Sequence, residues 1–295
     1  MENRQKRFEA TAQFLLEKFP RERENKYDNE EWVLYETYIP QVLALAANYN
    51  DSQSKPDPLI ANMDFVNLLV NAANWLGMAI GAQERYDESL ELLRKAEEIL
   101  DGPAGDIPTR KMVWRFNTSR NYYCMGKFQE AEALLSKALE QAEALGGWYQ
   151  LVYAHLTFSS LKTRIGQLGN ANEHVDIAKH IIETSGLAAR FSWLSSYTAY
   201  RAGDVAMKQG RVKDAIEEME KATIIGKLVK APIGILCRCI HAYSKALAMD
   251  PTRAEEAEHQ RQEARRLRAQ IPGDSGDLDD ESDQVFERLV KMDHR

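Results

Sequence analysis

The chain has 295 residues, with 38 Lys and Arg residues and 45 Asp and Glu residues, so its net charge is −7. This charge argues against general binding of nucleic acids, because such binding needs surplus positive charge. Hydrophobic residues make up 44% and charged residues 28% of the chain, as in globular proteins, so a disordered chain is not expected. Only 16 glycines and 9 prolines are present, which favours long helices over a β-sandwich or barrel.

The first segment, residues 1–58, is predicted to be an irregular helical cap. Apolar residues at helical spacing indicate a helix over residues 3–19, and these are Phe8, Leu15 and Phe19. A second helix is expected to pass through Pro40, and the polar, proline-containing stretch 50–58 is predicted to be a loop. No apolar run is long enough for a secretory signal or a membrane span, so we expect a soluble protein without a membrane partner.

A pattern of small and apolar residues then repeats along residues 59–271. A small residue starts each copy of the pattern, an apolar residue follows four positions later, and an alanine follows three positions after that. The small residues are Ser89, Ala131, Ala171 and Ala215, at steps of 42, 40 and 44. A degenerate fifth copy places Ala257 and Ala264 after a further 42 residues. Spacings of three and four mark one face of a helix, and small residues there let a second helix approach closely.

An amphipathic stretch precedes each of these helices, so each copy is predicted to be a helical hairpin. Three of the connections contain a glycine, which can adopt the positive φ that a short turn between helices needs, and these are Gly126, Gly166 and Gly210. The copies are placed near residues 70–100, 112–145, 152–184, 196–228 and 232–271. The stretch from Met63 to Ala82 carries no turn signal, although a repeat boundary should fall nearby.

This pattern resembles the tetratricopeptide (TPR) repeat, in which a Leu-Gly pair and a tyrosine on the first helix precede small and apolar residues on the second. The matching residues are Leu76-Gly77, Tyr122 and Ala202-Gly203. The longer period is similar to that of kinesin light chain arrays and of the C-terminal arrays of fungal NACHT or NB-ARC receptor-like proteins. The resemblance implies an all-α, right-handed solenoid of helical hairpins, whose first helices line a concave groove.

In the register of the repeats, the groove is expected to be basic and aromatic. The candidate groove residues are Asn74, Trp75, Asn117, Arg120, Tyr123, Tyr153, Arg164, Tyr197, Tyr200, Arg201, Lys208, Arg238 and Tyr243. The groove positions of the repeats contain five basic residues and one acid, Asp204. Tyrosine and arginine often supply binding energy at interfaces, and the resemblance implies that Asn117 pairs with a ligand backbone.

The sequence therefore predicts a scaffold or protein-interaction module in the cytoplasm that binds an acidic peptide, without a cofactor and without nucleic acid. The alternative reading of the aromatic residues is that half of the tyrosines belong to the core between repeats. The carboxylate clamp of chaperone-binding TPR proteins is not matched, because Trp75 and Met78 stand where its first pair is expected.

A catalytic role is the alternative to the interaction module. Residues 279–283, Asp-Asp-Glu-Ser-Asp, have the DDxxD form with which all-α terpene synthases hold magnesium and a prenyl diphosphate, so Asp279, Asp280 and Asp283 are the candidate metal ligands. The motif lies in an acidic tail, residues 272–295, where such a match arises easily by chance. This tail is predicted to be a linker with a short final helix over about residues 284–292, and it can also fold back onto the groove as an occluding segment.

Three further groups of residues are expected to be structural. Cys237, Cys239 and His241 could form the corner of a metal site, but two residues apart on a helix the thiols point in different directions, which favours buried packing. His155 and His174 are expected to be isolated. The basic run 261–268 has acids at ion-pair spacing, which favours a solvated helix over a nucleic-acid patch.

Overall fold

A computed structural model describes residues 2–19, 32–77, 85–102, 108–190, 192–231, 233–271 and 277–289. Most of these residues are in helices, and there is no strand among them. The helices are α1 (Glu2–Lys18), α2 (Trp32–Gln53), α3 (Met63–Leu76), α4 (Tyr86–Leu100), α5 (Pro108–Cys124), α6 (Phe128–Leu145), α7 (Trp148–Arg164), α8 (Leu168–Ser185), α9 (Leu187–Arg190), α10 (Ser192–Lys208), α11 (Val212–Leu228), α12 (Ile233–Ala248), α13 (Ala254–Arg268) and α14 (Asp283–Arg288), with a 3₁₀ turn η2 (Pro251–Arg253).

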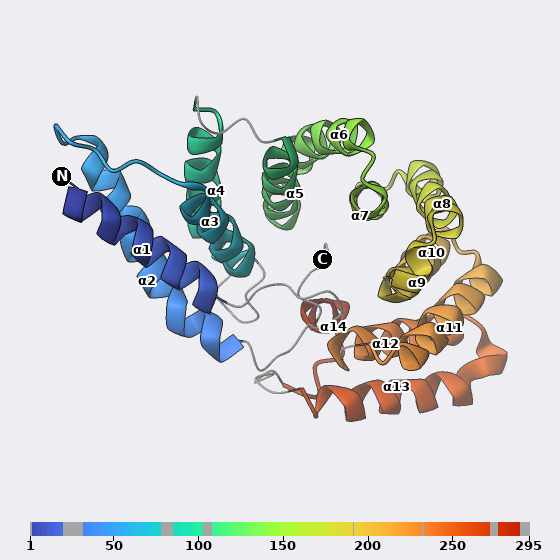
Figure 1. The fold of residues 1–295 in the computed structure, drawn as a ribbon. Coiled ribbons are helices and arrows are strands. Elements are labelled where there is room, and N and C mark those ends of the chain that lie inside the picture. Colours follow the sequence, from blue (N-terminus) through green and yellow to red (C-terminus); the bar gives the residue numbers. More distant parts are fainter. Residues whose placement is uncertain are drawn as a thin grey trace.

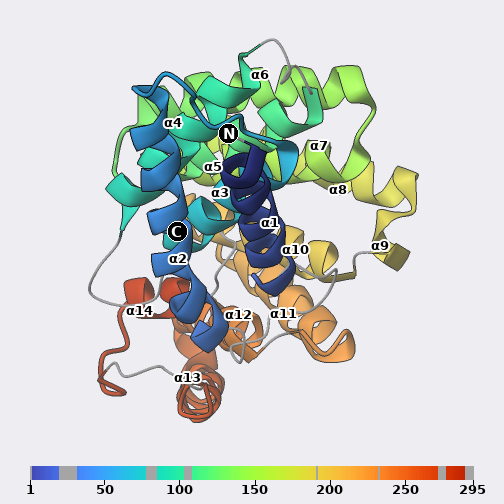
Figure 2. The same cartoon turned by 60° about the vertical axis from the view of Figure 1, so that its left-hand side comes forward.

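The helices pack in consecutive pairs, α3 with α4, α5 with α6, α7 with α8, α10 with α11 and α12 with α13. The pairs follow one another along an arc, in which α5, α7, α10 and α12 lie toward the inner side (Figure 1). Figure 2 brings the N-terminal helices α1 and α2 forward, at the other end of the arc from α13. The all-α solenoid of paired helices is therefore confirmed.

The small residues of the repeat pattern lie where the two helices of a pair meet. Ser89, Ala131, Ala171 and Ala215 are all buried. Gly203 on α10 serves the same purpose, because a Cβ atom there would lie 2.8 Å from Cγ of Met219 on α11. The close contact of the paired helices thus depends on residues with little or no side chain.

The connections within three pairs contain the predicted glycines. Gly126, Gly166 and Gly210 have φ values of 75°, 79° and 72°. Their amides lie at the ends of α5, α7 and α10, where this left-handed conformation terminates the helix and satisfies its last carbonyl groups. The amides of Lys127, Gln167 and Arg211, which follow these glycines, donate to carbonyls of the preceding helix.

The N-terminal helices α1 and α2 both pack on α3 and share one hydrophobic core with it. The predicted loop begins later than expected, because α2 extends to Gln53. The Ser52 hydroxyl then accepts a hydrogen bond from the amide of Leu59 at 3.0 Å, which holds the turn after this helix. The continuous stretch 63–82 is helical as far as Leu76, and residues 78–82 lie outside the described ranges.

Within the described ranges, every helix is either too short or too polar to span a bilayer.

Candidate functional site

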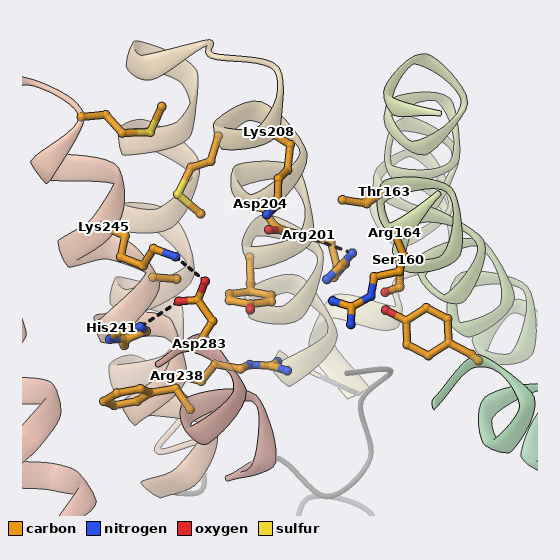
Figure 3. A pocket seen from close by; sticks show the side chains of 16 residues that line it. Ser160, Thr163, Arg164, Arg201, Asp204, Lys208, Arg238, His241, Lys245 and Asp283 are labelled. Carbon is orange, nitrogen blue, oxygen red and sulfur yellow. Dashed lines mark hydrogen bonds and ion pairs between the residues drawn. The ribbon is translucent and has the colours of Figure 1, made fainter. Parts of the chain in front are cut away.

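A cavity of about 540 Å³ lies between α7, α10 and α12, and α14 closes one of its sides. Figure 3 shows the side chains that line it, and they come from helices far apart in the sequence. The lining residues are Tyr123, Ser160, Thr163, Arg164, Tyr200, Arg201, Asp204, Met207, Lys208, Arg238, His241, Ala242, Lys245, Met249, Asp283 and Phe286.

The lining is strongly basic, in contrast to the acidic chain as a whole. Its arginine and lysine side chains are Arg164, Arg201, Lys208, Arg238 and Lys245. Its acids are Asp204 and Asp283. Cations gathered in a hollow between low-dielectric walls raise the local concentration of anions, so the cavity favours a negatively charged ligand.

Two of the cations are buried and held in place by neighbours on the same face. Arg201 is 6% exposed, and its Nη2 atom lies 3.3 Å from Oδ2 of Asp204, one helical turn further along α10. The guanidinium of Arg238 on α12 lies over the ring of Tyr200, 4.2 Å from its centroid. Stacking on an aromatic face fixes a guanidinium while leaving its edge able to donate.

The C-terminal helix places an acidic side chain in this cavity. Oδ1 of Asp283 lies 3.1 Å from Nε2 of His241, and its Oδ2 accepts a hydrogen bond from Nζ of Lys245 (Figure 3). These two contacts, that of His241 first, hold the pKa of Asp283 well below its usual value. The chain therefore supplies a carboxylate of its own to the basic cavity.

The segment before α14 is bound by the cations of α13. Arg268 donates to the carbonyl oxygens of Asp280 at 2.7 Å and of Asp277 at 3.0 Å. Arg265 pairs with Asp279 at 2.5 Å, and Arg261 pairs with Glu281 at 2.8 Å. The basic run of α13 thus binds the acidic tail, in addition to the ion pairs within the helix that its sequence predicts.

The structure brings together some of the predicted groove residues at the cavity and places others elsewhere. Those that line it are Tyr123, Arg164, Tyr200, Arg201, Lys208 and Arg238. Tyr197 and Tyr153 do not line it. Tyr197 is buried in the core to which α7, α8, α10, α11 and α12 contribute. The half-buried Tyr153 packs edge-on against Phe116, with ring centroids 5.7 Å apart.

The N-terminal candidates lie away from the cavity. Trp75 is 1% exposed and stacks on Tyr35 of α2, with ring centroids 4.1 Å apart, so it belongs to the core and not to a groove. Arg120 is buried as well, and its Nη2 atom donates to the carbonyl of Asn74 at 3.3 Å. Asn74 and Asn117 are half-buried. These residues connect neighbouring inner helices and do not line the cavity.

Tyr243, which the repeat register assigns to the groove, does not line the cavity either. It is buried, and its hydroxyl donates to Glu256 of α13 at 3.1 Å, so it lies between α12 and α13. Burial, together with this hydrogen bond, raises the pKa of Tyr243 to about 12. The residues of α12 that face the cavity are Arg238, His241, Ala242, Lys245 and Met249.

Sequence reasoning therefore missed His241 and Lys245, because the register in the fifth copy is one residue late. The turn η2 lengthens the connection between α12 and α13. When the repeat register is counted back from Ala257, each groove position on α12 therefore falls one residue after the residue that faces the cavity. The spacing of Arg238, His241, Ala242 and Lys245 was the available signal, since three and four residues apart is one face of a helix.

The three aspartates predicted as metal ligands in the tail each bind different groups of the chain. Asp279 pairs with Arg265, Asp283 contacts His241 and Lys245, and Oδ1 of Asp280 accepts from the amide of Ser282 at 2.9 Å. In the described part of the chain, no group of three or more His, Cys, Asp and Glu residues is arranged to hold a metal ion. The geometry thus provides no magnesium site at residues 279–283.

The remaining cysteines and histidines have structural surroundings. Cys237 and Cys239 are buried on α12, as their spacing predicts. His155 and His174 are not isolated, because their Nδ1 atoms lie 2.9 Å apart between α7 and α8. This pair could not be predicted from helical spacing, since the two residues are on different helices.

Comparisons with known proteins support the fold alone. No protein-family model matches the chain, and no curated protein matches it in sequence. Among solved structures, the crystal structure of BtubC (BKLC) from P. vanneervenii is similar, with a TM-score of 0.60 and 13% sequence identity. The match covers 82% of this chain and 94% of that one. This similarity shows a helical repeat solenoid.

Proposed function

We propose that this chain is a TPR-like protein-interaction module of the cytoplasm, which binds an acidic segment of a partner protein in the basic cavity between α7, α10 and α12. The observation that supports the proposal is the position of Asp283, which lies in the cavity with a separate donor at each carboxylate oxygen, His241 and Lys245. The chain's own tail thus shows how an acidic residue on a short helix fits against this surface.

The wider setting is consistent with a binding role. Arg164 and Lys208 are exposed at the end of the inner helices α7 and α10, where an incoming chain can reach them. Arginine and tyrosine, which account for five of the sixteen lining residues, provide large contact areas and several donors at interfaces. A cytoplasmic location fits the three cysteines, none of which forms a disulfide bond.

The tail also gives a suitable probe for the experiment. A fluorescein-labelled peptide with the sequence of residues 277–289 is titrated with the full-length protein, and binding is followed by fluorescence anisotropy. The control peptide has every Asp and Glu replaced by Asn and Gln. We expect the acidic peptide to bind the Asp283→Ala variant more tightly than the wild type, because that variant leaves His241 and Lys245 without their carboxylate partner.

Charge-reversal variants locate the binding surface. The double variant Arg164→Glu with Lys208→Glu is expected to lose the acidic peptide, because both cations line the cavity. The matched control is Lys213→Glu on the outer helix α11, where the side chain is 87% exposed. Equal binding of the acidic and the neutral peptide, or equal loss in the control variant, would rule out an acidic ligand in this cavity.

A further inference from the structure

The two ends of the cavity differ in what they offer to an anion. At the α12 end, the two oxygens of Asp283 take one donor each, from His241 and Lys245. This matches the number of oxygens in a carboxylate. The α12 end therefore already holds a carboxylate, which α14 supplies.

The other end, formed by α7 and α10, holds three cations, Arg164, Arg201 and Lys208, and one acid, Asp204. Arg164 and Lys208 line it, and their side chains make no hydrogen bond or ion pair with any residue in the described ranges. Figure 3 shows Arg164 and Arg201 extending from their two helices into the same space. Like charges that converge in this way repel each other unless an anion lies between them.

The helix dipoles of α7 and α10 do not explain the position of Arg201 in this group of cations. Cations in the last turn of a helix interact favourably with its dipole, which accounts for Arg164 and Lys208 separately. Arg201 lies in the middle of α10 and is nearly fully buried, where a charge is costly. Its Nη2 atom lies 3.3 Å from Oδ2 of Asp204, which is the acid on this side of the cavity.

The charge count favours a group with more than one negative charge. Five arginine and lysine side chains and two aspartates line the cavity, so the formal charge of these seven side chains is +3. A phosphate monoester carries about −1.5 to −2 at neutral pH and offers three acceptor oxygens. One carboxylate would satisfy a single guanidinium, whereas a phosphate can bridge donors from two helices.

We propose that the α7–α10 end of the cavity, formed by Arg164, Arg201 and Lys208, is a phosphate subsite for a phosphorylated serine or threonine in the acidic partner segment. This inference rests on the proposed function and specifies its ligand: the acidic residue of the partner takes the place of Asp283, and the phosphorylated residue bridges α7 and α10. Hydroxyls of Ser160 and Thr163 donate to carbonyls of their own helix, so the donors to the phosphate are the three cations.

The test uses the full-length Asp283→Ala protein and a set of labelled peptides of one acidic sequence, in which a single position is serine, aspartate or phosphoserine. We expect the phosphoserine peptide to bind about tenfold more tightly than the aspartate peptide, because it gains at least one charge-assisted hydrogen bond. The variants Arg164→Met and Lys208→Met, both at exposed positions, are expected to abolish this preference. Lys213→Met on α11 is the matched control and should preserve it.

The outcomes separate this inference from the proposed function. If the aspartate and phosphoserine peptides bind equally, the phosphate subsite is wrong and acidic-segment binding stands. If none of the peptides binds, both are wrong. Free phosphoserine and inorganic phosphate serve as competitors. If millimolar phosphate alone displaces the phosphopeptide, the subsite binds small phosphorylated molecules, and the proposal of a peptide ligand is wrong. If the phosphopeptide is displaced by an acidic peptide but not by free phosphate or phosphoserine, the peptide ligand is supported.

Discussion

The imidazole of His241 lies flat against the ring of Phe286, with ring centroids 3.8 Å apart and an angle of 3° between the planes. Phe286 is almost fully buried and also belongs to the hydrophobic cluster that α12 and α13 form. Since α14 has only six residues, it is too short to be stable as an isolated helix. Its position must therefore depend on such contacts.

Replacing Phe286 with alanine is expected to release α14 from the cavity. Amide hydrogen exchange of residues 277–289 should accelerate, because the aromatic contact and its buried surface are lost. The transition temperature should also fall, because Phe286 belongs to the buried cluster formed with α12 and α13. Leu278→Ala, at a position that is 44% exposed, is the control and should leave exchange unchanged. Undiminished protection of residues 277–289 in the Phe286 variant would show that other contacts hold the helix.

The contact of Asp283 with Lys245 is expected to persist under mildly acidic conditions. Its pKa is lowered in the folded protein, whereas in the unfolded chain an aspartate titrates near about pH 4. The stabilisation is therefore present at neutral pH and is lost only as the pH falls below about 4 and through the lower pKa of the folded state. Hydrogen exchange of α14 at about pH 7 and about pH 5, corrected for the intrinsic rate, should give similar protection. Release of α14 at about pH 5 would contradict the prediction.

The repeat pattern was sufficient to predict the helix pairs. The pattern Ser89, Ala131, Ala171 and Ala215 reports directly on helix contact, because any larger side chain would separate the paired helices. The glycines of the connections were predictable for a related reason, since few other residues adopt positive φ. Both signals are local, so they can be read without knowing the rest of the fold.

The candidate site was only partly predictable, because its missing parts depend on distant contacts. Arg164, Arg201 and Lys208 follow from the repeat register, which the glycine connections fix. The register of α12 depends on the length of the turn η2, which the alanine pattern does not reveal. The position of Asp283 depends on the docking of α14, 42 residues from His241 along the chain, and periodicity within helices carries no information on such contacts.

The histidine pair between α7 and α8 is expected to make stability depend on pH. Burial, followed by the neighbouring His174, lowers the pKa of His155 to about 4, and burial also lowers that of His174, which Lys162 and Glu132 face. The unfolded chain binds protons near about pH 6.5 while the folded one does not, so the free energy of unfolding must fall as the pH decreases from about 6.5 toward 4.

Urea unfolding at about pH 7.5 and about pH 5 measures this dependence. The wild type should have a lower urea midpoint at the acidic pH. A His155→Asn variant should show a smaller difference between the two conditions. His259→Gln, at an exposed position on α13, is the control and should retain the full difference. Equal midpoints for the wild type at both pH values would exclude the pair as a source of pH sensitivity.

The contact between Ser89 and Asn121 is expected to stabilise the first two helix pairs. The Ser89 hydroxyl donates to the carbonyl of Ala73 at 2.5 Å and accepts from Nδ2 of Asn121 at 2.6 Å, and both side chains are fully buried. Ser89→Ala leaves the Asn121 amide without this acceptor, which should lower the free energy of unfolding by about 1–3 kcal/mol. Ser136→Ala provides the control, because that half-buried hydroxyl donates to the carbonyl of Glu132 in its own helix. Chemical denaturation of both variants gives the comparison. Equal destabilisation would mean that Asn121 finds another partner, and that the polar contact between α4 and α5 is not specific.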